Sequence, residues 1–212
     1  MIAHFVITIS TFFLHNETIN IWSHAFGAVI FVVLSTHVLL QSHVPFPRRM
    51  IIFFYTMSAI ICFSMSALYH LFRDMSPKAT TTWSHLDHFG ILVLLVGSDV
   101  PMLMFGLACA PTARLVYVVA VSILVPSAGI ALITKRCRRT SWRGWRVTCF
   151  VALCAIGWSH MLYEIIIKGG IGTPRGNSVL RMWGSAFGAY GIGLVLYLTF
   201  VPERWFLGMF DI

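Results

Sequence analysis

The sequence predicts an all-α polytopic membrane helix bundle, and three observations lead to that prediction. Hydrophobic residues make up 58% of the 212 residues and charged residues only 10%, whereas soluble domains carry about 25% charged residues. The mean hydropathy is +0.83. Apolar runs near the roughly 20 residues that a helix needs to cross a bilayer recur along the whole chain. They occupy residues 21–41, 50–72, 83–106, 113–134, 147–167 and 182–201.

No linker or low-complexity segment separates the six runs, so we expect a single transmembrane domain over residues 1–212. The composition argues against a soluble globular protein. The five cysteines are scattered and form no C-x-x-C pair. Neither a disulfide framework nor a sulfur metal site is therefore indicated.

The first three runs carry polar residues at one end. Glu17 and Asn20 precede the first run, and Asn20 is followed by Ile-Trp-Ser-His, which suits a helix start with an interfacial tryptophan. His70 lies near the end of the second run, and Ser66 lies four residues earlier on the same helix face. Asp87 lies about one turn into the third run. These five residues are the candidates for a functional site.

The later runs set the orientation in the membrane. Segment 135–146 joins the fourth and fifth runs and holds six of the fifteen Lys and Arg residues. A basic segment between two spans is typical of a cytoplasmic loop, so we expect no nucleic-acid partner. The N-terminus is then cytoplasmic too, and the five candidate residues converge at the cytoplasmic face. In the sixth run, Gly184 and Gly188 form a small-residue packing face.

Each candidate taken singly also has an ordinary structural explanation. A lone histidine near a helix end is commonly interfacial, and serine is a routine packing residue in membrane helices. Glu17 and Asn20 suit a helix cap. Asp87 is harder to explain in this way, because an ionisable residue inside a span is costly and tends to mark a functional site.

Three further polar residues receive no role from the sequence. His85 and His88 flank Asp87 and lie three residues apart, on one face of a helix. These two histidines could serve as metal ligands, although positions at the membrane interface suit them better. Asp99 lies in the middle of the third run, two residues before Pro101, where a helix kink is expected.

Taken together, the motifs resemble the progestin and adipoQ receptor family, which includes hemolysin III-like proteins and adiponectin receptors. The motifs are Glu17-x-x-Asn20, then Ser66-Ala-Leu-Tyr-His70 with Asp87 further on. The resemblance implies a seven-helix bundle, oriented opposite to G-protein-coupled receptors, with a third motif H-x-x-x-H at the start of the seventh helix. The sequence ends where that helix should begin, so we expect a C-terminally truncated sequence with six of seven helices.

The resemblance also implies a zinc site near the cytoplasmic face. His70 is expected to bind the metal directly, and the remaining ligands to lie beyond the end of the sequence. Asp87 is expected to be the catalytic residue that orients the attacking water, with Ser66 beside the site. Glu17 and Asn20 are expected to brace the cytoplasmic end. Three neutral imidazoles would leave zinc an open position at which water is activated.

Two function classes follow from this resemblance. One is a zinc-dependent, ceramidase-type hydrolase that cleaves a ceramide-like membrane lipid at its amide bond, with room for control by an extracellular protein or steroid ligand. The other is a non-enzymatic membrane receptor, or a transporter or homeostasis regulator, in which zinc is structural. In both classes the protein is a multi-pass integral protein of the plasma membrane or an endomembrane.

Overall fold

The computed structural model describes most of the chain as helices joined by turns. The described residues are 17–133, 140–142, 144–145, 147–148, 151–155, 163–167, 170–201 and 204–205. No strand occurs among these residues. The chain forms two compact units, Met1–His160 and Met161–Ile212.

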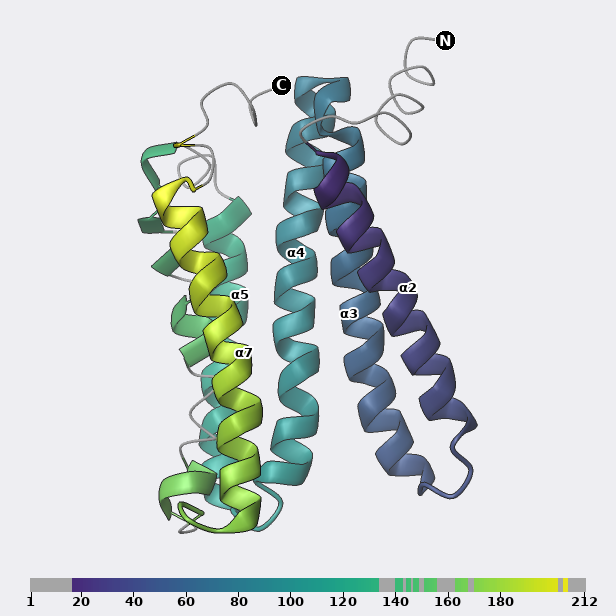
Figure 1. Cartoon of the computed structure of the whole chain (residues 1–212), viewed down its shortest axis with the longest axis vertical. Helices are drawn as coiled ribbons and strands as arrows, with labels where there is room; N and C mark the ends of the chain where they lie inside the picture. Colours follow the sequence, from purple (N-terminus) through teal and green to yellow (C-terminus); the bar gives the residue numbers. More distant parts are fainter. Residues whose placement is uncertain are drawn as a thin grey trace. The chain divides into compact units, whose positions relative to one another are not determined.

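Among the described residues, the first unit contains four long helices, and α3 packs between α2 and α4 (Figure 1). The second unit contains one long helix, α7. Short 3-10 helices cover Arg73–Met75 and Thr140–Trp142, and π-helices cover Met102–Gly106 and Tyr163–Ile167. The long helices are α2 Thr18–Leu40, α3 Phe46–Phe72, α4 Pro77–Pro101, α5 Pro111–Ile133 and α7 Pro174–Thr199.

Five helices in the described part of the chain are long and apolar enough to cross a membrane, which confirms the predicted all-α membrane bundle. The fifth predicted span, 147–167, lies partly outside the described residues, as does the basic segment 135–146. Large apolar side chains on α2, such as Phe26 and Val33, are exposed, as expected of a surface that faces lipid. The five spans are Thr18–Leu40, Phe46–Met75, Pro77–Gly106, Pro111–Gly129 and Gly176–Thr199.

Several helices begin earlier than the apolar runs predict, because proline and a capping side chain start them. Pro77 and Pro174 lie in the first turns of α4 and α7, where a missing N–H is harmless. The Ser76 hydroxyl accepts a hydrogen bond from the backbone N–H of Ala79 at 3.1 Å. The Thr173 hydroxyl accepts one from Gly176 at 3.0 Å. Hydropathy marks only the apolar part of each helix and misses these polar first turns.

Close backbone approach joins α3 to α4. A Cβ atom at Gly97 would lie 2.0 Å from the Ser58 hydroxyl oxygen and 2.4 Å from the Ser58 Cβ. A Cβ at Gly90, seven residues earlier, would lie 3.0 Å from the Cα of Cys62. The two helices can therefore touch only because both positions lack a side chain, as is common between membrane helices.

The helical pattern of α4 changes at Pro101, where a kink was expected. The α-helix ends there, and the next five residues, Met102–Gly106, form a π-helix. Proline lacks the N–H that would bond to the carbonyl of the preceding turn. The π-helix continues the helical path past the missing hydrogen bond.

Candidate functional site

A buried carboxylate gathers three polar side chains where α2 begins and α3 ends. Glu17 directly precedes α2, and only 6% of its surface is exposed. Its Oε2 atom lies 2.6 Å from Nδ1 of His70 and accepts a hydrogen bond from the Asn20 amide at 2.8 Å. Its Oε1 atom pairs with the guanidinium of Arg73. Glu17 therefore ties α2 to the last turn of α3.

The surroundings of Glu17 keep its carboxyl group ionised. Burial on its own raises the pKa of Glu17, but hydrogen bonds from His70 and Asn20 and the charge of Arg73 outweigh burial and lower the pKa to about 2. An ionised carboxylate can only accept hydrogen bonds. The Nδ1 atom of His70 must therefore carry the proton in this contact.

A second histidine, His24 of α2, adjoins this cluster. Its ring stacks on the ring of His70 with centroids 5.6 Å apart and planes 14° apart. Its Nδ1 atom lies 3.3 Å from the hydroxyl oxygen of the buried Ser66. Ser66 therefore reaches the site through His24.

Asp87, in the third turn of α4, lies at the same end of the unit. Its carboxylate interacts electrostatically with His24, Cys62 and Tyr69. No hydrogen bond or ion pair joins Asp87 to another residue in the described part of the chain. The structure thus brings Asp87 to the site without a direct contact to His70, and a water bridge between the two stays a prediction.

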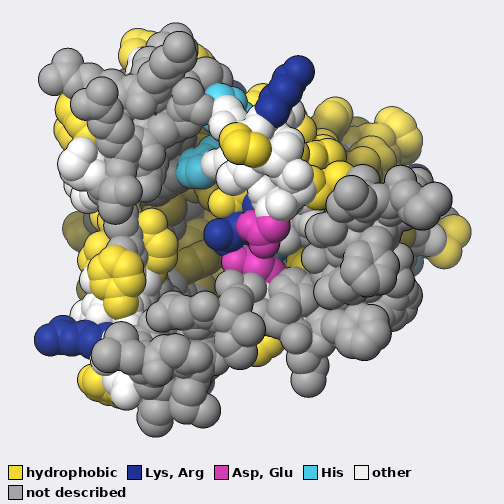
Figure 2. All heavy atoms as spheres, turned by 90° about the horizontal axis from the view of Figure 1, so that it is seen from above, with side chains coloured by type: hydrophobic (Ala, Val, Ile, Leu, Met, Phe, Trp, Pro, Cys, Tyr) yellow, Lys and Arg dark blue, Asp and Glu magenta, His cyan; other side chains and the backbone are white. Residues whose placement is uncertain are grey.

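Figure 2 looks down on the end of the molecule where α2 begins and α3 gives way to α4. Acidic, basic and histidine side chains lie between hydrophobic ones on this face. His88 lies close to Asp87 in sequence, but its Nδ1 atom lies 2.6 Å from the carbonyl oxygen of Ser84 in its own helix. The interfacial interpretation of His88 stays a prediction.

An apolar cavity of about 970 Å³ runs between α3, α4 and α5. On α4 it begins at Phe89, two residues past Asp87, and ends at Val100. A cavity of this size and lining suits an alkyl chain. Its walls extend over Phe53–Ile61 of α3, Phe89–Val100 of α4 and Val125–Gly129 of α5.

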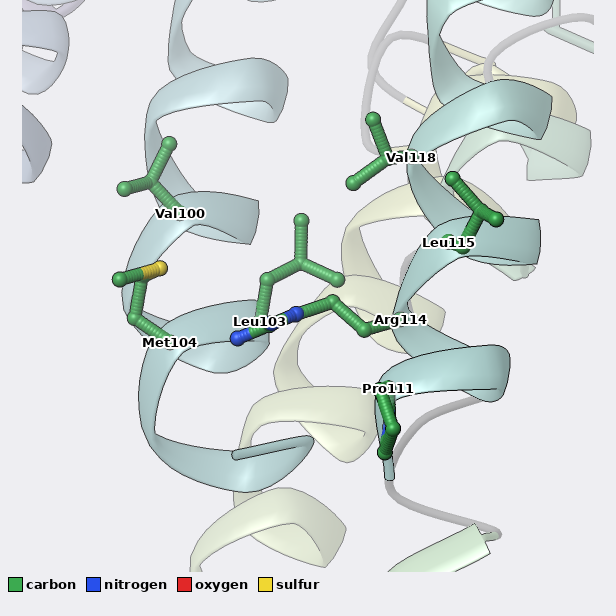
Figure 3. Close-up of a pocket in the computed structure, with 7 residues that line it drawn as sticks. All are labelled: Val100, Leu103, Met104, Pro111, Arg114, Leu115 and Val118. Atoms are coloured by element: carbon green, nitrogen blue, oxygen red, sulfur yellow. The ribbon is translucent and has the colours of Figure 1, made fainter. Parts of the chain in front are cut away.

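A smaller cavity of about 380 Å³ lies at the far end of α4, against the start of α5. Arg114 extends from α5 toward Leu103 in an otherwise apolar lining (Figure 3). Nearby, Asp99 of α4 interacts with Tyr117 of α5. Leu103 lies sixteen residues beyond Asp87, about 24 Å along a helix, so this cavity is separate from the candidate site.

Comparison with known proteins identifies the family. The model of the family described as "Haemolysin-III related" matches residues 12–212. The chain belongs to this family.

The relatives of this haemolysin-III-related chain include receptors of the progestin and adipoQ group. It is 30% identical over 201 residues to "Progestin and adipoQ receptor-like protein 1" of Caenorhabditis elegans, covering 94% of this chain and 46% of that protein. It is 30% identical over 206 residues to "Adiponectin receptor protein" of Drosophila melanogaster, covering 96% and 46%. It is 29% identical over 211 residues to human "Progestin and adipoQ receptor family member 3", covering 95% and 67%. The chain spans about half the length of the first two relatives.

The polar contacts of this haemolysin-III-related chain show how its motifs meet in space. Glu17 occupies the position before α2, yet its side chain makes no capping hydrogen bond. The carboxylate instead contacts His70, Asn20 and Arg73. The alternative that Glu17 only caps a helix is therefore wrong.

Two residues of the cluster, His24 and Arg73, had no role assigned from the sequence. Glu17, Asn20 and His24 lie at intervals of three and four residues, so helical periodicity places them on one face. Arg73 lies three residues past His70 by the same rule. The spacing was visible, but an arginine at a helix end is so common that nothing singled it out.

One described side chain, His70, has contacts that suit a zinc ligand. Among the described residues, no group of three or more His, Cys, Asp or Glu side chains could hold a metal ion. A histidine that binds a metal through one ring nitrogen commonly donates the other N–H to a carboxylate, and His70 has such a contact with Glu17. The other ligands of a zinc site would have to come from outside the described residues.

Proposed function

We propose that this protein is a zinc-dependent hydrolase of a lipid amide, of ceramidase type, with its site near the cytoplasmic face of the membrane. The observation that carries the proposal is the contact of His70 Nδ1 with the buried Glu17 carboxylate at 2.6 Å. This contact leaves Nε2 as the ring nitrogen available to a metal. His70 would hold zinc together with histidines of an H-x-x-x-H motif outside the described residues.

We assign the other roles in hydrolysis, besides metal binding by His70, to further described residues. Zinc, when bound, supplies Lewis-acid chemistry that polarises a carbonyl group and activates water. Asp87 would orient that water and accept its proton during attack on the amide carbon, as a general base. His24 and Ser66 keep polar groups beside His70. Together they define a polar reaction centre at one end of the unit.

The apolar cavity supports a lipid as the substrate class. It starts on α4 two residues past Asp87 and has room for an alkyl chain along α3, α4 and α5. A ceramide-like lipid could keep its acyl chain there while its amide group lies at the polar end. The substrate would then not need to leave the bilayer.

The names of the relatives support a second candidate, a receptor in which zinc is structural. The chain is similar to a protein named for adiponectin and to others named for progestin and adipoQ. An extracellular protein or a steroid is the partner class that these names suggest. In this second function Asp87 has no catalytic role.

Replacement of Asp87 separates the two candidates. The Asp87→Asn variant of the full-length protein should retain its zinc but lose lipid-amide hydrolysis by at least about 100-fold. Zinc is measured by elemental analysis and hydrolysis by mass spectrometry of ceramide in detergent. Asp74→Asn serves as the matched control, because the Asp74 side chain is 70% exposed and contacts Arg73; it should leave both quantities unchanged. Equal hydrolysis by the wild type and Asp87→Asn would contradict the proposed role of Asp87 in a hydrolase.

The proposal also places the N-terminus and segment 135–146 in the cytoplasm. A cysteine introduced by Arg139→Cys should resist a membrane-impermeant thiol reagent in intact cells and react after permeabilisation. Labelling from outside intact cells would reverse the orientation. It would also move the polar site to the opposite face of the membrane.

A further inference from the structure

We propose that the smaller cavity, between the end of α4 and the start of α5, is a fatty-acid site in which Arg114 binds the carboxylate. The cavity measures about 380 Å³, and small-molecule sites measure about 300–1,000 Å³. It is separate from the candidate site around Glu17 and His70. The proposal therefore does not depend on the hydrolysis proposed for that site.

The cavity lies at the level where two membrane spans end. Met104 in its wall is close to the end of the span Pro77–Gly106, and Arg114 is close to the beginning of the span Pro111–Gly129. The ends of spans lie near the lipid headgroups, at the edge of the hydrocarbon layer. A fatty acid in the surrounding bilayer has its carboxylate at the same level.

The lining of the cavity matches the two parts of a fatty acid. Arg114 is its one charged residue, and the other described residues of the lining are apolar. Val100 and Val118 lie on one side of the Arg114 head group and Pro111 lies on the other side (Figure 3). The two valines are further from the span ends than Arg114 is. An alkyl chain could follow them toward the bilayer interior while its carboxylate contacts Arg114.

The charge of Arg114 has room for an anion. No hydrogen bond or ion pair joins its side chain to another residue in the described part of the chain. Asp99, the α4 carboxylate closer to this cavity, interacts with Tyr117 instead. Arg114 is also the fourth residue of α5, where the helix dipole disfavours a cation. A bound anion would interact favourably with both the guanidinium and the helix dipole.

A second feature of the cavity comes from α4. Leu103 and Met104 in its wall belong to the π-helix Met102–Gly106, which follows Pro101. Single π-helical turns inside longer helices are frequent at functional sites. The irregular segment of α4 and the charged residue of α5 thus meet at one cavity, although they come from different helices.

The chemistry of the lining favours a fatty acid over a phospholipid. A carboxylate is planar and accepts two parallel hydrogen bonds from one guanidinium. A phospholipid would add ester groups and further headgroup atoms, which an apolar lining leaves without hydrogen-bond partners. A fatty acid has a single polar group, and Arg114 alone can satisfy it.

An arginine near a helix end can also be an ordinary interfacial residue, with its head group in water or among lipid phosphates. In Figure 3, however, the Arg114 side chain extends across the cavity toward Leu103 of α4. The two roles predict different results for Arg114→Lys. Lysine serves equally well as an interfacial cation, but it cannot form the paired hydrogen bonds of a guanidinium.

The experiment uses the full-length protein in phosphatidylcholine nanodiscs and palmitic acid with a diazirine on its alkyl chain. Light attaches the probe, and mass spectrometry of peptides gives the labelled positions and the apparent Kd. We expect labelling within residues 100–118. Unlabelled palmitic acid should displace the probe, whereas phosphatidylglycerol and the uncharged alcohol of the same chain length should not. Arg114→Gln should raise the apparent Kd about 10-fold or more, and Arg114→Lys about 3- to 10-fold.

Two pairs of variants separate the cavity from general effects on the membrane. Arg181→Gln removes an exposed arginine of α7 that lines neither cavity, so the apparent Kd should stay within about twofold of wild type. Val118→Phe narrows the cavity and should weaken labelling. Val116→Phe is its matched control, because Val116 is 65% exposed and also lines neither cavity.

Four outcomes would overturn the proposal. Equal displacement by palmitic acid and the alcohol would mean that the carboxylate is not recognised. Displacement by phosphatidylglycerol at the same concentrations would assign the cavity to a phospholipid. Wild-type affinity in Arg114→Lys would make Arg114 an interfacial residue, and labelling confined to the larger cavity would exclude this site. If Arg114→Gln does not fold, the displacement series on the wild type still decides.

Discussion

In the described part of the chain, the contact of the end of α3 with α2 and the contact of α3 with α4 are stabilised in different ways. Against α2, the end of α3 uses polar side chains: Glu17 contacts His70 and Arg73, and His24 contacts Ser66. Against α4, it uses the absence of side chains at Gly90 and Gly97.

The difference shows how one helix can make two kinds of contact. We call the close contact of α3 with Gly90 and Gly97 of α4 the glycine seam; the polar contact with α2 can change with its surroundings. A glycine seam permits one separation of the helix backbones, because any added atom overlaps its neighbour. A polar cluster depends on protonation, on charge and on whatever binds it. The functional candidates lie at the polar contact, whereas the glycine contact holds α4, and with it Asp87, at a fixed distance from α3.

The largest expected effect comes from filling the glycine seam. Gly97→Leu should destabilise the protein by about 3 kcal/mol or prevent its folding, because even a Cβ atom there overlaps Ser58. Thermal unfolding in detergent measures the loss. Gly191→Leu on α7 is the matched control, since a Cβ at Gly191 meets no described residue within 4 Å. If the two variants were equally stable, the seam would not hold the helices together.

Removing the central carboxylate should have the next largest effect. Glu17→Ala should lower the free energy of unfolding by about 2 kcal/mol, because it leaves the His70 and Arg73 donors without their acceptor. The same unfolding assay applies.

A double variant that combines Glu17→Ala with Gly97→Ala should lose the sum of the two single effects, because distant sites act independently. Strong coupling would mean that the polar contact and the seam are one structural feature.

Acidification should weaken the polar contact selectively. The pKa of Glu17 is about 2 in the folded protein, against 4.5 for an unperturbed glutamate. The stability that this depressed pKa contributes is present above pH 4.5 and is lost as pH falls toward 2. Between pH 7 and pH 4 the loss should be about 1 kcal/mol. The difference in stability between wild type and Glu17→Gln isolates this contribution, and a difference that does not change with pH would contradict it.

The smallest effect is expected at the edge of the cluster. Ser66→Ala should cost about 0.5 kcal/mol, because the 3.3 Å contact of its hydroxyl with His24 is weak. Ser127→Ala on α5 is the matched control, since that hydroxyl donates to the carbonyl of Ile123 in its own helix. A loss above 2 kcal/mol for Ser66→Ala would mean that Ser66 is as central to the site as Glu17.

The sequence predicted the membrane class and most of the spans because both depend on local composition. Helices of about 20 apolar residues are forced by the bilayer itself, since unpaired backbone groups cannot be left in hydrocarbon. The starts at Pro77 and Pro174 were missed because capping and proline geometry act on polar turns that hydropathy ignores.

The packing of the helices was harder to predict than their existence. Gly184 and Gly188 of α7 form the more familiar motif, yet a Cβ at either meets nothing within 4 Å among the described residues. Gly90 and Gly97, seven residues apart, are the glycines of α4 that contact α3, and Gly27 of α2 lies against Phe63 of α3. Spacing alone cannot tell which glycine faces a neighbour, because that depends on how each helix is rotated in the bundle.

The candidate site was predictable in its members more than in its contacts. Glu17, Asn20 and His70 were identified from their motifs, and the structure brings Asn20 and His70 each within hydrogen-bond distance of Glu17. The sequence could not predict which atoms are in contact, because that depends on the relative depth of α2 and α3. His24 and Arg73 were left out because single residues of these types have many ordinary positions at helix ends.

The length of α3 has a consequence for the depth at which this chemistry would occur. With its 3-10 extension the helix covers 30 residues, Phe46–Met75, or about 45 Å at 1.5 Å per residue. The hydrocarbon layer is about 30 Å thick, and the whole bilayer with its headgroups is about 45 Å thick. A helix centred in the bilayer therefore passes out of the hydrocarbon about five residues before its end, and His70 lies five residues before Met75. Water and the polar linkage of a membrane lipid meet at that boundary, so neither would need to be drawn into the oily interior to reach the histidine.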